Sequence, residues 1–102
     1  DLSNDARIRD PGITAAKCEF GVGPERQACT RGVAYALLDN TWDGRYVFPF
    51  CGTFKADKDV AYCFTISASY LRATFDRGHE EVITDCQRYA AKAVLCREIS
   101  GG

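Results

Sequence analysis

The segment YVFPFCGTFKADKDVAYCFTIS, residues 46–67, sets two runs rich in aromatic residues on either side of a charged stretch. The runs at residues 46–54 and 60–67 have the composition of β-strands. Residues 55–59 between them are polar and charged, as is typical of a hairpin loop. The segment therefore predicts an antiparallel hairpin centred near Asp57.

Outward from this hairpin, each flank carries one helix and one further strand. A helix is expected over residues 24–40, where Pro24 suits a first turn and apolar residues recur at helical spacing. A second helix is expected to begin at about Asp76 as its N-cap, with acidic residues in its first turns. Alternation of apolar and polar residues predicts a strand over residues 13–22, with Cys18, Phe20 and Val22 on its one buried face. A short strand is expected over residues 94–99.

The expected order is strand, helix, strand, strand, helix, strand. Two split βαβ units of this kind predict an α+β fold, the ferredoxin-like two-layer α/β sandwich βαββαβ, with one antiparallel four-stranded sheet and two helices on one face. We expect a mobile N-terminal arm at residues 1–12, a single domain at residues 13–99 and a frayed tail at residues 100–102. No linker divides the chain.

The six cysteines are an even set spread over the chain: Cys18, Cys29, Cys51, Cys63, Cys86 and Cys96. No pair has the Cys-x-x-Cys spacing and the chain has a single histidine, so the usual zinc and thioredoxin-like patterns are absent and no metal is expected. Three disulfides formed in an oxidising compartment are the expected state. This predicts a secreted, extracellular protein whose signal segment is already removed.

Two arrangements of the hairpin cysteines stay open. In the first, which we favour, Phe50 and Phe64 face the core and Cys51 bonds Cys63 across the hairpin, leaving the other four cysteines to pair at the helix–strand contacts. In the second, Cys51 and Cys63 reach the helices and an aromatic patch remains on the open side of the sheet. That patch would be a surface for a partner or for a second copy, so we expect a monomer or a weak dimer.

Charge and hydropathy exclude several function classes. The formal net charge of −1 lacks the basic excess that nucleic-acid binding requires. No apolar run approaches the roughly 20 residues that a transmembrane helix needs. We therefore expect that the chain does not bind nucleic acid and that it has no transmembrane segment.

His79 is the one candidate for acid–base chemistry. It precedes Glu80 and Glu81, and Asp85 follows one turn later. These residues are explained more simply as the solvent-exposed first turn of a helix. No catalytic residue and no cofactor are therefore expected. The alternative is a small secreted hydrolase or nuclease that uses His79 or Arg26.

Trp42 and Arg45, in the loop before the first hairpin strand, are the candidate partner-contact residues. Tryptophan and arginine are the types that dominate binding energy at protein interfaces. The alternative for Trp42 is a lid over the end of the sheet.

The run from Phe75-Asp76-Arg77-Gly78 through Asp85-Cys86-Gln87-Arg88-Tyr89 to Cys96, with nine residues between the two cysteines, resembles a known family. It is similar to the C-terminal part of the P-six-type killer toxins, which are virally encoded toxins of smut fungi. The resemblance covers about residues 70–97 in sequence and residues 13–99 in expected topology. Killer-toxin-like folds also occur among secreted effectors of plant-pathogenic fungi.

The resemblance implies a secreted, disulfide-stabilised, non-enzymatic fungal effector or killer-toxin-like virulence protein. It would act in the plant apoplast or the extracellular medium by binding a protein or surface component of a host or competitor cell. No catalytic residue is carried over, because an active site does not define the family. A protease inhibitor or adhesion module is a further alternative.

Overall fold

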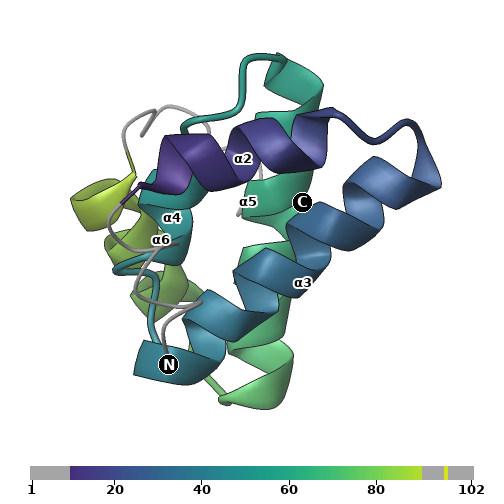
Figure 1. Ribbon diagram of the computed structural model, residues 1–102. Helices are drawn as coiled ribbons and strands as arrows, with labels where there is room; N and C mark the ends of the chain where they lie inside the picture. The colour runs from purple at the N-terminus through teal and green to yellow at the C-terminus, as the bar shows by residue number, and fades with distance from the viewer. Residues whose placement is uncertain (1–9, 91–95, 97–102) are drawn as a thin grey trace.

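The computed structural model describes residues 10–90 and 96, and all the regular secondary structure within them is helical (Figure 1). The described residues form five helices and no strand. The helices are α2 (Pro11–Glu19), α3 (Pro24–Thr41), α4 (Val47–Cys51), α5 (Asp57–Thr74) and α6 (His79–Tyr89).

The predicted hairpin, and with it the ferredoxin-like sandwich with its four-stranded sheet, is wrong. Residues 46–54 contain the short helix α4, and residues 60–67 lie inside the 18-residue helix α5. The buried residues of α5 recur at intervals of three and four, which is the period of a helix with one buried face; they are Asp59, Val60, Cys63, Phe64, Ser67, Ala68 and Leu71. Aromatic composition suggested strands, but this spacing determines the structure.

The strand predicted at residues 13–22 is wrong for a similar reason. Ala15 and Cys18, three residues apart, are buried on α2, whereas Phe20 and Val22 are exposed. The helix expected over residues 24–40 is confirmed as α3.

The other boundaries differ from expectation in detail. The last helix is present as α6, but Gly78 is its N-cap, and Asp76 instead has a left-handed backbone with φ of 54°. Residues 94–99 lie outside the described residues except Cys96. The predicted arm also falls outside them at residues 1–9, and α2 already begins at Pro11.

The core lies between α3 and α5, with α4 packed against both helices. Phe48 of α4 and Phe64 of α5 meet edge to face with ring centroids 5.5 Å apart. Both rings are fully buried, as the favoured arrangement of the aromatic residues requires. Gly44 lies against Phe48 so closely that a Cβ at this position would overlap the ring.

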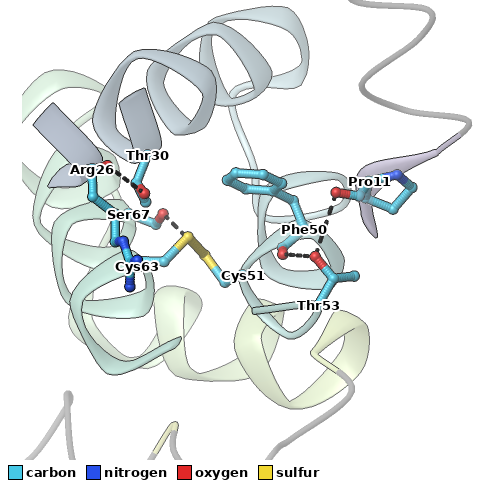
Figure 2. The surroundings of a disulfide bond; sticks show 8 residues. All are labelled: Pro11, Arg26, Thr30, Phe50, Cys51, Thr53, Cys63 and Ser67. Carbon is cyan, nitrogen blue, oxygen red and sulfur yellow. Dashed lines mark hydrogen bonds between the residues drawn. A yellow bond between two sulfur atoms is a disulfide. The ribbon is translucent and has the colours of Figure 1, made fainter. Parts of the chain in front are cut away.

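Three disulfides join Cys18 to Cys29, Cys51 to Cys63 and Cys86 to Cys96, so the expectation of three disulfides is confirmed. The Cys51–Cys63 bond is the one predicted, although it links α4 to α5 rather than two strands (Figure 2). The Ser67 hydroxyl lies 3.8 Å from Cys51 Sγ beside this bond.

Candidate functional site

Trp42 occupies the C-cap of α3, where the chain leaves the helix. Its backbone is left-handed, with φ of 62° and ψ of 19°, and its N–H donates to the Leu38 carbonyl at 2.7 Å. The side chain is 66% exposed. The helix end therefore presents the only tryptophan of the chain to solvent.

The Trp42 ring is the outermost of four aromatic rings in continuous contact. It stacks on Phe75 with centroids 5.8 Å apart, and Phe75 meets Tyr70 edge to face at 5.6 Å. Tyr70 stacks on Tyr35 at 4.1 Å. We call Trp42, Phe75, Tyr70 and Tyr35 the aromatic ladder; it runs along the C-terminal halves of α3 and α5.

The inner end of the ladder is held by a hydrogen bond between these two helices. The Tyr70 hydroxyl donates to Asp39 Oδ1 at 2.7 Å. This bond, followed by desolvation, raises the pKa of Tyr70, because the phenol is stabilised in its protonated form. The hydrogen bond joins α5 to α3 beside the stacked Tyr35–Tyr70 pair and holds it in place.

Arg77 holds the outer end. Its Nη1 donates to the Trp42 carbonyl at 3.0 Å and lies 3.2 Å from Asp85 Oδ2. Asp85 is buried and also accepts the Gly44 N–H at 3.1 Å. Arg77 and Asp85 therefore tie the loop after α3 to the start and middle of α6.

Arg45 lies in the same loop as Trp42, but its guanidinium is paired with Asp43 at 3.1 Å. The Asp43 carboxylate raises the pKa of Arg45 through its charge and its hydrogen bond. The Arg45 side chain is half exposed, so a partner at Trp42 could also reach it. The alternative role of Trp42, a lid over the end of the sheet, is wrong, because residues 10–90 contain no strand.

His79 is exposed at the first position of α6. Its carboxylate neighbours have structural partners: Glu81 accepts the Gly78 N–H at 3.0 Å, and Asp85 is bound by Arg77 and Gly44. The hollow beside His79 has a volume of about 10 Å³, which is enough for one water molecule.

Arg26, the second residue of the hydrolase alternative, is a cross-link between helices. Its Nε donates to the Gly21 carbonyl at 3.0 Å, and its Nη2 donates to the Glu19 carbonyl at 2.7 Å. Its Nη1 pairs with Asp59 at 3.0 Å. The guanidinium thus fastens the turn between α2 and α3 to the first turn of α5.

Sequence reasoning missed the inner rings of the ladder and the exposure of two apolar side chains. Phe20 and Val22 are 89% and 72% exposed, although both were expected on the buried face of a strand. Tyr35 and Tyr70 could have been found only from the correct helical registers of α3 and α5. In the described part of the chain, no three His, Cys, Asp or Glu side chains are grouped to hold a metal ion.

Comparison with protein-family models, with curated proteins and with solved structures finds no match to this chain. No helix within the described residues is long and apolar enough to cross a membrane.

Proposed function

We propose that this chain is a secreted, disulfide-stabilised protein that acts without catalysis, by binding a protein on a host or competitor cell through the outer end of the aromatic ladder. Three disulfides support an oxidising, extracellular setting. The likeness of about residues 70–97 to killer toxins supports the toxin or effector class, although the sandwich fold that it implied is contradicted by the helical structure.

The observation that carries the proposal is the conformation and exposure of Trp42. A left-handed backbone costs an L-residue with a side chain roughly 1–2 kcal/mol, and glycine is the usual residue at such a helix end. Stacking on Phe75 returns about 0.5–1.5 kcal/mol. A tryptophan that is 66% exposed thus adds little to stability, whereas an exposed, fixed indole is well suited to anchor a partner.

The ladder also lowers the entropic cost of binding. The Arg77 and Tyr70 hydrogen bonds fix both ends of the ladder before any partner arrives. Side chains that are already ordered lose less freedom on association, which favours affinity.

The test is saturable binding of fluorescently labelled, fully oxidised protein to intact fungal and plant cells. We expect unlabelled wild-type protein to compete and unlabelled Trp42→Ala to compete at least tenfold more weakly. Arg31→Ala is the matched control, because Arg31 is exposed on α3 and, among the residues that the structure describes, donates to the Tyr62 hydroxyl alone. Protease treatment of the cells should abolish binding if the target is a protein.

Equal competition by Trp42→Ala and wild-type protein would refute the proposed surface. Growth-inhibition and leaf-infiltration assays with the same proteins test the toxin or effector class separately. Activity in either assay that is lost in Trp42→Ala and kept in Arg31→Ala would join the surface to the effect.

A further inference from the structure

The outward side of α2 is apolar although it is exposed. Ala15 and Cys18 face the core. On the opposite side of the helix, Ile13, Ala16 and Phe20 recur at intervals of three and four, and the two large side chains, Ile13 and Phe20, are 59% and 89% exposed. A helix that only covers a core carries polar residues on its outer side. The outer side of α2 therefore departs from that pattern.

Val22 extends this apolar surface into the turn that follows α2. The described residues have four exposed large apolar side chains, and three of them, those of Ile13, Phe20 and Val22, fall within residues 13–22. We call these three residues and Ala16 the α2 face. Figure 1 shows α2 on the outside of the molecule and the turn to α3 projecting beyond it. Exposed apolar side chains gathered in one place mark a contact with a protein or a membrane.

The segment that carries the α2 face is firmly held. The Cys18–Cys29 disulfide joins α2 to α3. Arg26 donates to the carbonyl groups of Glu19 and Gly21 in the turn, at 2.7 Å and 3.0 Å. Side chains on such a braced segment lose little conformational freedom when they enter another phase.

The exposed charged residue within α2 is Lys17, which lies on the outward side beside the apolar residues. The carboxylate of Glu19 accepts the Lys55 N–H at 3.1 Å. Two exposed acidic residues flank the face, Asp10 before α2 and Glu25 on α3. A lysine among apolar residues can extend its ammonium group to lipid phosphates while its neighbours enter the acyl boundary. Its charge complements an anionic lipid surface.

A second copy of the chain fits the α2 face less well. A two-fold axis through the middle of the face places the central residues beside their own copies. Lys17 lies near that middle, between Ile13 and Phe20 along the helix, so two like charges would meet. Three large apolar side chains also provide much less than the roughly 800 Å² per partner of a standard interface.

We infer that the α2 face inserts into the surface of an anionic lipid membrane, with Ile13, Phe20 and Val22 at the acyl boundary and Lys17 among the headgroups. The helix lies along the membrane surface and does not cross it. The turn after α2 and Trp42 lie at opposite ends of α3, about 27 Å apart for 18 residues. The lipid contact is therefore separate from the aromatic ladder and does not depend on the proposed function.

The test is flotation of the oxidised full chain with vesicles of phosphatidylcholine that contain about 30% phosphatidylserine. Vesicles of pure phosphatidylcholine are the second arm. A single myristoyl chain binds membranes with an association constant of roughly 10⁴ M⁻¹. We expect the wild-type protein to bind about tenfold more weakly, with half of it bound near about 1 mM anionic lipid. Phe20→Ser should bind at least about tenfold more weakly than wild type, because the ring no longer leaves water.

The charge is tested separately. Lys17→Glu should lower binding to the anionic vesicles at least about fivefold and change binding to pure phosphatidylcholine by less than about twofold. Arg72→Glu is the matched control, because it makes the same change of charge in the last turn of α5, and it should bind like wild type. Trp42→Ala, which removes an exposed aromatic residue outside the α2 face, should also bind like wild type.

Phe20→Ser should keep the far-ultraviolet spectrum and the unfolding midpoint of wild-type protein, because the ring is exposed. Wild-type protein that does not float with about 5 mM anionic lipid overturns the inference. So does a Phe20→Ser or Lys17→Glu protein that binds like wild type, or binding that is lost only in Trp42→Ala. Sedimentation without lipid tests the other occupant: self-association that Phe20→Ser removes would assign the face to a second copy and overturn the lipid contact.

Discussion

The guanidinium of Arg26 lies 3.0 Å from the carboxylate of Asp59, 33 residues away in sequence, and joins the first turn of α3 to the first turn of α5. The same guanidinium holds two carbonyls of the turn after α2. One side chain thus fixes three helices relative to one another. Neither partner is free in solvent, since their side chains are 27% and 11% exposed.

We predict that Arg26→Ala lowers the free energy of unfolding by about 2 kcal/mol, because hydrogen bonds from a charged donor are lost and partly buried acceptors stay behind. The thermal midpoint should fall by about 10 °C for a domain of this size. Arg31→Ala, the exposed control on the same helix, should stay within about 0.5 kcal/mol of wild type. Urea unfolding with intact disulfides measures both, and equal effects would contradict the structural role of Arg26.

Gly44→Ala should destabilise the protein by about 1–3 kcal/mol, because the added methyl group overlaps the buried Phe48 ring. Gly32→Ala is the matched control inside α3, where an added Cβ meets nothing within 4 Å. This control should gain up to about 1 kcal/mol from the higher helix propensity of alanine. The opposite signs of the two changes are the prediction, and unfolding curves that shift in the same direction would contradict it.

The disulfides differ in burial although they close loops of similar length. Cys18–Cys29 and Cys51–Cys63 span 11 and 12 positions, so loop closure is expected to contribute about 3 kcal/mol in each case. Cys51 and Cys63 are both fully buried, whereas Cys29 is partly exposed. Replacing the Cys51–Cys63 pair with alanine should thus cost about 1–2 kcal/mol more, because it also leaves a cavity.

Comparison of the two double variants, Cys18→Ala with Cys29→Ala and Cys51→Ala with Cys63→Ala, measures this difference in urea. The loss of unfolding free energy that both variants share measures loop closure. The additional loss in the Cys51–Cys63 variant measures core packing. An equal or larger loss at Cys18–Cys29 would show that burial of the sulfur atoms is not what separates the two sites.

Part of this structure could be predicted from the sequence. Helix α3 was recognisable because Pro24 marks its start and its apolar residues recur at helical spacing. The burial of Phe48, Phe50 and Phe64 followed from the size of their apolar surface in whichever element carries them.

The pairing of Cys51 with Cys63 was expected for the wrong reason. Residues that face each other across a hairpin can also meet between two helices joined by a short connection, so the disulfide did not distinguish the folds. The spacing of Val60, Cys63, Phe64 and Ser67 did distinguish them, since a strand would turn alternate residues outward. Aromatic composition is the weaker signal because it depends on burial context.

The binding surfaces were less accessible to sequence reasoning. Trp42 could be proposed from its residue type alone. Its stacking on Phe75 depends on the left-handed turn after α3 and on the break between α5 and α6, which no local pattern specified. The alternating pattern around Phe20 predicts a buried position, whereas α2 ends at Glu19 and leaves the ring exposed.

Glu81 provides a pH-dependent contribution to stability. The Gly78 N–H that it accepts, followed by the charge of Arg77, holds the pKa of Glu81 below its ordinary value of 4.5. Since the unfolded chain takes up the proton first, this contribution is fully present above pH 4.5 and is lost as the pH falls through the lowered pKa.

Glu81→Gln should thus unfold at a lower temperature than wild type at neutral pH and converge with it in acid, where the glutamate is itself neutral. Glu80→Gln, in the same helix turn but outside the bond to Gly78, is the control and should show a smaller dependence on pH. Thermal unfolding across the acid range measures both variants. A gap between Glu81→Gln and wild type that persists unchanged in acid would argue against the carboxylate as its source.

Trp42 separates stability from binding, and two substitutions test this directly. Trp42→Ala loses the stacking on Phe75 and keeps the strained backbone, whereas Trp42→Gly loses the stacking and relieves the strain. We predict that the glycine variant is about 1 kcal/mol more stable than the alanine variant and close to wild type in urea unfolding. Both variants should lose cell binding to the same extent, because both lack the indole. A glycine variant that is less stable than the alanine variant would mean that the left-handed backbone at position 42 does not destabilise the fold. The exposed indole would then need a structural explanation in place of a partner.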